Sequence, residues 1–116
     1  MGVPQSGTLA CSKAQWQMVE SRKDATAGKG KHYALTLVEE RPLAQVTAAE
    51  KAELVGIAWR LAEELGLGNR FRISVNGPGL VRRDTLHIHI VFVNEGVEHV
   101  NLTDPRSILA NPATTA

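Results

Sequence analysis

Residues 47–66 contain the feature that most constrains the fold, an amphipathic helix with both ends marked in the sequence. Thr47 and Glu50 are spaced as a capping box, in which each side chain bonds the backbone N–H of the other residue. Apolar residues then recur at three- and four-residue spacing, at Leu54, Ile57, Leu61 and Leu65. Gly66 provides a left-handed stop. The pattern predicts one main helix at about residues 48–65, with an apolar stripe about 100° wide.

Two alternating segments follow this helix and predict β-strands. Residues 71–76 alternate strictly, and Gly77-Pro78-Gly79 interrupts the pattern. Residues 85–93 alternate again, so that successive side chains point to opposite faces of a strand. One face carries Leu86, Ile88, Ile90 and Phe92, and the other carries His87, His89, Val91 and Val93.

Two further β-prone segments precede the helix. Residues 15–21 and 32–38 have the alternation of short strands, and the basic, glycine-containing stretch 22–31 between them reads as a loop. These segments predict an antiparallel hairpin. Together with the later strands, they predict an α+β protein in which an antiparallel meander sheet packs with one main helix.

Length and composition favour one small domain. The chain has 116 residues, and we expect a flexible tail at residues 1–12, a domain at 13–104 and a second tail at 105–116. A formal net charge of +1 gives no global attraction to nucleic acid or to an anionic membrane. A single cysteine, Cys11, and the lack of a signal peptide or a long apolar run favour a cytoplasmic protein.

His87 and His89 are the residues that point to chemistry. Two histidines at positions i and i+2 of a strand face the same way, with Cα atoms about 6.5–7 Å apart. This spacing suits two ligands of one metal, with Glu95 or His99 completing the set, or a nucleophilic imidazole beside a second ring. The plainer interpretation is a pair of histidines on the solvated face of a sheet.

The preceding loop favours a phosphate ligand. If strands 71–76 and 85–93 pair, Asn76 comes close to the imidazoles, together with Gly77, Arg83, Asp84 and Thr85. Glycine permits close approach of the backbone, and arginine can bind a phosphate through two N–H groups. No cofactor or resident metal is predicted for this site.

At these residues the chain resembles the histidine-triad (HIT) family, whose signature strand alternates three histidines with apolar residues. Here the strand reads His87-Ile88-His89-Ile90-Val91-Phe92-Val93, and His87 lies eleven positions after Asn76, as the family pattern requires. The resemblance covers residues 32–93. It implies a HIT-like sheet and, as partners, a nucleotide or other phosphorylated small molecule and a second copy of the chain in a homodimer. Trp16 and Trp59 are expected in the core or the dimer interface.

The resemblance also implies roles for individual residues. His89 takes the position of the nucleophile that attacks a nucleotide phosphate, His87 supports it, and Asn76 contacts the phosphate. The third histidine is replaced by Val91, and the Ser/Thr that assists the leaving group is replaced by Asp84.

Three functions remain open at this point. The first is a nucleotide-phosphate hydrolase or transferase of altered chemistry, of the phosphoramidase or nucleotidyl hydrolase type. The second is a nucleotide-binding protein without turnover, and the third is a His-x-His metal-binding protein.

Overall fold

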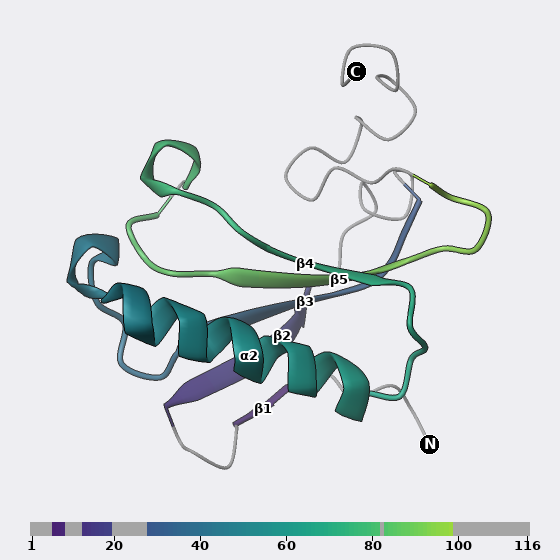
Figure 1. Cartoon of the computed structure of the whole chain (residues 1–116), viewed down its shortest axis with the longest axis horizontal. Helices are drawn as coiled ribbons and strands as arrows, with labels where there is room; N and C mark the ends of the chain where they lie inside the picture. The colour runs from purple at the N-terminus through teal and green to yellow at the C-terminus, as the bar shows by residue number, and fades with distance from the viewer. Residues whose placement is uncertain (1–5, 9–12, 20–27, 82, 99–116) are drawn as a thin grey trace.

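The computed structural model describes residues 6–8, 13–19, 28–81 and 83–98, and shows one helix lying across an antiparallel sheet (Figure 1). In chain order the elements are β1 (Ser6–Thr8), β2 (Ala14–Val19), β3 (Lys29–Leu37), the 3-10 helix η1 (Leu43–Gln45), α2 (Ala48–Glu64), β4 (Phe71–Val75), the 3-10 helix η2 (Pro78–Leu80) and β5 (Ile88–Val93). The predicted α+β class, an antiparallel sheet with one main helix, is confirmed.

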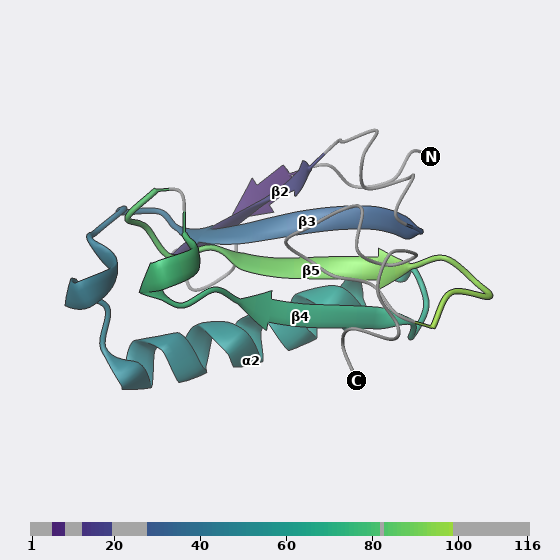
Figure 2. The same cartoon turned by 90° about the horizontal axis from the view of Figure 1, so that it is seen from above.

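The strands are arranged in the order β1-β2-β3-β5-β4, and every neighbouring pair is antiparallel. The sheet is therefore a meander only from β1 to β3. Helix α2 then carries the chain to the far edge, where β4 forms, and β5 returns between β4 and β3 (Figure 2). Because of this return, β5, which contains His89, has a strand on each side.

The predicted helix is confirmed to within one residue. Both hydrogen bonds of the capping box are present, from the Glu50 amide to the Thr47 hydroxyl and from the Thr47 amide to the Glu50 carboxylate, each at 3.1 Å. Leu65 is the C-terminal cap, and Gly66 follows with a φ of +68°. The left-handed backbone at Gly66 is unfavourable for residues with a Cβ, which explains the stop.

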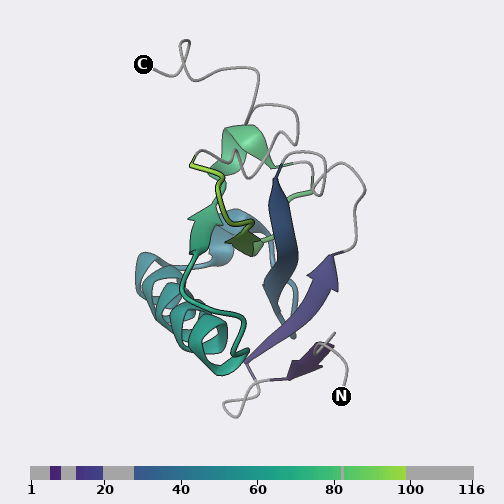
Figure 3. The same ribbon diagram turned by 90° about the vertical axis from the view of Figure 1, so that its right-hand side faces the viewer.

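The apolar stripe of α2 packs on one face of the sheet (Figure 3). Its buried residues are Leu54, Ile57, Ala58, Leu61 and Ala62. Opposite them, the buried side chains of the central strands include Tyr33, Leu35, Ile88, Ile90 and Phe92. Burial raises the pKa of the Tyr33 phenol. Each leucine, isoleucine or phenylalanine side chain buried in this layer contributes about 1.5–3 kcal/mol to folding.

Strand β3 begins earlier than the sequence predicts. Residues 29–31 were expected in the basic loop, but they belong to β3, and Lys29 is paired with Val93 across a register shift. A Cβ on Gly30 would lie 3.0 Å from the Phe92 carbonyl oxygen. The glycine therefore permits a close approach of the two backbones that local composition does not reveal. Residues 20–27 of the predicted loop and strand lie outside the described part.

Strand β5 begins later than predicted, at Ile88 instead of Thr85. The Asp84 carboxylate accepts a hydrogen bond from the Leu43 amide at 3.2 Å, and the Thr85 amide donates to the Arg83 carbonyl at 2.7 Å. These bonds hold residues 83–85 in a bend, so the alternation in this stretch does not become a strand.

The expected tails are described only in part. Residues 6–8, within the N-terminal stretch that was expected to be flexible, form β1 and pair with β2. The stretch 105–116 lies outside the described residues. None of the helices in the described ranges is long and apolar enough to cross a membrane.

Candidate functional site

The site lies on the face of the sheet opposite α2. Directly paired residues of antiparallel strands share a face, and the register of the strands defines one transverse row on this face. From edge to edge, the row consists of Ser6, Gln17, Ala34, His89 and Ser74. The row places the predicted nucleophile, His89, between a small side chain on β3 and a hydroxyl on β4.

His89 is hydrogen-bonded to a histidine that the motif does not contain. Its Nδ1 lies 2.9 Å from Nε2 of His32, and the two ring centroids are 5.1 Å apart. His32 is on β3, is only 7% exposed, and pairs with Val91, so that it is the diagonal neighbour of His89. Ala34, directly opposite His89, is small and leaves room for the ring to reach His32.

The tautomer of His89 depends on which ring donates the hydrogen bond between His89 and His32. When Nδ1–H of His89 donates to Nε2 of His32, the lone pair of His89 is on Nε2. That nitrogen is then the nucleophilic atom. The arrangement resembles other nucleophile sites, in which a second group orients the imidazole through its opposite nitrogen.

His87 lies just before β5 and is held by Thr85. Its Nδ1 is 3.2 Å from the Thr85 carbonyl oxygen and 3.4 Å from the Thr85 hydroxyl. A carbonyl oxygen only accepts, so this contact favours a hydrogen on Nδ1. His87 and His89 are therefore both fixed through Nδ1, but by different partners.

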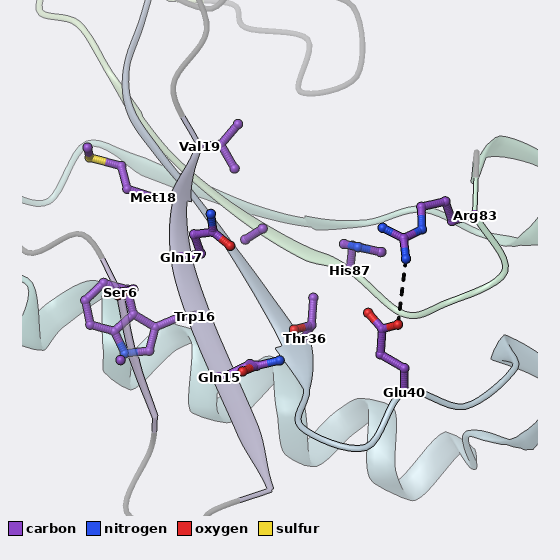
Figure 4. Close-up of a pocket in the computed structure, with 12 residues that line it drawn as sticks. Ser6, Gln15, Trp16, Gln17, Met18, Val19, Thr36, Glu40, Arg83 and His87 are labelled. Carbon is purple, nitrogen blue, oxygen red and sulfur yellow. Dashed lines mark ion pairs between the residues drawn. The ribbon is translucent and has the colours of Figure 1, made fainter.

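A groove of about 840 Å³ opens beside His87 (Figure 4). Its polar lining includes Ser6 on β1, Gln15 and Gln17 on β2, Thr36 on β3, and, at one end, Glu40, Arg83 and His87. Arg83 and Glu40 approach to 3.8 Å there, and both side chains are exposed. The groove thus offers amide and hydroxyl groups next to a cation and an imidazole.

The predicted ligand-binding residues divide into two groups. Asn76 follows Val75, the partner of Ile88, and this register brings it to the level of His87. Arg83 lines the groove with His87. Asp84 instead bonds the Leu43 amide and Thr85 contacts His87, so their described contacts hold the loop. A Cβ on Gly77 would meet no protein atom within 4 Å, so the space beside this glycine is open.

His32 and Ser74 are the residues that sequence analysis missed. His32 was read as an end of a strand, although the alternation of β3 already separates it from the buried Tyr33 and Leu35. That alternation is the signal that could have placed it on the histidine face. Its partner, His89, lies 57 positions away in sequence, and only the β3–β5 register brings the two residues together.

A metal centre finds little support in the described ranges, where no three His, Cys, Asp or Glu side chains are grouped to hold an ion. Glu95, one predicted ligand, is on the turn after β5, whereas His87 precedes that strand. His99, the other, lies outside the described residues.

The chain matches no model of a known protein family, no curated protein and no solved structure.

Proposed function

We propose that the protein is a HIT-like nucleotide-phosphate hydrolase or transferase of altered chemistry, with His89 as the nucleophile. The observation that carries this proposal is the 2.9 Å contact between His89 Nδ1 and His32 Nε2. A hydrogen-bonded partner on Nδ1 is what an imidazole needs in order to present Nε2 to an electrophile.

The proposed reaction has two steps at phosphorus. His89 Nε2 forms a bond to the phosphorus atom while the bond from phosphorus to the leaving group breaks, and the leaving group departs with the bonding electron pair and takes up a proton from solvent. The resulting phosphorylated imidazole carries positive charge, which His32 stabilises by accepting the Nδ1–H. Water, or an acceptor alcohol in a transferase, then attacks phosphorus and releases its proton to solvent, while the P–N bond breaks and its electron pair returns to Nε2 of neutral His89.

The surrounding groups fit a phosphorylated ligand. Arg83 is an exposed cation beside His87, and guanidinium groups bind phosphate oxygens in a bidentate manner. The amides of Gln15 and Gln17 provide donors and acceptors for a base or sugar in the same groove. Val91 stands at the position of the third triad histidine, and its partner on β3 is His32, so a second imidazole reaches this part of the sheet from the neighbouring strand.

The proposal is tested by following turnover of a labelled nucleoside phosphoramidate. Wild type is expected to release the amine, and His89→Ala to abolish release. Glu63→Gln, on the exposed side of α2, is a matched control that should keep wild-type activity. Turnover that survives His89→Ala would exclude the mechanism.

A nucleotide-binding protein without turnover is the second candidate. It is favoured by Asp84, which replaces the leaving-group hydroxyl of the family and is bonded to the Leu43 amide. Calorimetry with nucleoside monophosphates separates the two candidates from an unrelated function. Binding without turnover would support this second candidate, and no binding at millimolar ligand would exclude both.

A further inference from the structure

The hydroxyl of Ser74 has an unusual position for a strand residue. Ser74 is the direct cross-strand partner of His89, on the same face of the sheet. Its Oγ is buried and has no hydrogen-bond partner among the described residues. Buried hydroxyls are nearly always paired, so an orphan beside the proposed nucleophile calls for an explanation.

Folding does not explain this serine. An unpaired buried hydroxyl opposes folding, and serine has a lower preference for strands than the β-branched valine. Strand β4 otherwise accommodates apolar residues at Ile73 and Val75. A residue that costs stability at a reactive position is typical of functional sites.

The position of Ser74 suggests what the hydroxyl binds. Its neighbour at i−2 on the same face of β4 is Arg72, and Asn76, at i+2, follows the end of the strand. Arg72 is opposite Val91, where the triad lacks its third imidazole. Ser74 is thus the direct partner of the proposed nucleophile and the diagonal neighbour of Val91.

We propose that Ser74 Oγ donates a hydrogen bond to a phosphoryl oxygen of the nucleotide bound at His89, and that it acts as a catalytic residue. The residue as a whole is partly exposed although its Oγ is not. Rotation about the Cα–Cβ bond moves the hydroxyl among three staggered positions, so it can be redirected toward a ligand. The inference rests on the proposed function, since it requires a phosphate at His89.

The test compares ligands with and without a phosphate. Binding of adenosine, guanosine, cytidine and uridine monophosphates, and of the four nucleosides, is measured by calorimetry for wild type, Ser74→Ala and Ser74→Thr. In Ser74→Ala, monophosphate binding should weaken about tenfold and nucleoside binding should not change, because a hydrogen bond to a charged group is lost. Ser74→Thr keeps a hydroxyl and should bind close to wild type.

Thermal unfolding without ligand gives an independent readout. Ser74→Ala removes an unpaired buried hydroxyl, so its melting temperature should equal or exceed that of wild type. A lower melting temperature would indicate a structural role and overturn the inference. Unchanged monophosphate binding in Ser74→Ala would also overturn it, while leaving the proposed function in place. Absence of monophosphate binding by wild type would instead refute the proposed function, and this inference with it.

Discussion

The contact between His32 and His89 depends on a hydrogen bond between their rings and on small side chains at the positions opposite them. They lie diagonally on neighbouring strands, and diagonal neighbours are within reach only of long side chains. Ala34, which is opposite His89, and Val91, which is opposite His32, leave the space between the two rings. We infer that His32 orients His89, which would make it a positioning residue for the proposed reaction.

Replacement of His32 tests this role. His32→Ala removes the acceptor from His89 Nδ1 and is expected to lower kcat by about 10²-fold or more, with a smaller change in KM. His32→Gln offers a carbonyl oxygen near the position of Nε2 and should recover part of the rate. Because His32 is buried, melting temperatures of both variants are measured alongside the kinetics. Equal rates for wild type and a folded His32→Ala would exclude the role.

At the scale of elements, one residue at the start of α2 takes part in both a capping box and an ion pair. Glu50 closes the capping box with Thr47 and also accepts hydrogen bonds from the Arg41 guanidinium. The Arg41 hydrogen bond, followed by the bond from the Thr47 backbone, lowers the pKa of Glu50 from 4.5 to about 2. Glu50 thus connects the segment before η1 to the helix that covers the core.

The lowered pKa predicts how stability depends on pH. The ionised Glu50 is favoured in the folded state, so its contribution is present above about pH 4.5 and is lost as pH falls toward about 2. Wild type should therefore lose more stability over this window than Glu50→Gln, as measured by urea unfolding at several pH values. Parallel pH profiles for the two proteins would contradict the prediction.

The N-cap hydroxyl provides a separate test of the same element. Thr47→Ala removes the acceptor for the Glu50 amide and should lower the free energy of unfolding by about 1 kcal/mol at neutral pH. Thr47→Ser keeps the hydroxyl and should lose much less. Urea unfolding at pH 7 measures both, and equal losses would exclude the hydroxyl as the cause.

At the scale of the whole molecule, β4 and α2 form a candidate dimer surface. Strand β4 is at the edge of the sheet formed by the described residues, and an edge offers unpaired backbone groups to another strand. On the adjacent helix, Trp59 is 54% exposed and contacts Phe71 of β4, with ring centroids 5.1 Å apart. Trp16, by contrast, packs against Tyr33 at the core. We propose that a second copy covers the Trp59 side.

Dimer formation is tested by sedimentation. Wild type is expected to sediment as a dimer, and Trp59→Glu as a monomer, because a charge would be buried at the interface. Leu80→Glu introduces the same charge at another exposed apolar residue, on η2, and should remain dimeric. A monomeric wild type, or a dimeric Trp59→Glu, would place the interface elsewhere or exclude it.

Local patterns determined the elements of this protein. The capping box and Gly66 predicted α2 to within one residue, because caps satisfy backbone groups of their own segment. Alternation predicted that Ile88, Ile90 and Phe92 share one face of β5, since the side-chain period of a strand is two. Two strand starts were wrong for non-local reasons: Lys29 is paired with Val93, and the Asp84 carboxylate is bonded to the Leu43 amide.

Tertiary structure alone decided which residues meet at the site. The sequence by itself placed His87 and His89 on one face, and the same alternation was available for His32. Only the insertion of β5 between β3 and β4, with its register, brought His32 to one side of His89 and Ser74 to the other. Register is set by packing of the whole apolar face against α2, and a shift by one residue would reverse every side chain. The contacts that define the site therefore depend on the complete sheet.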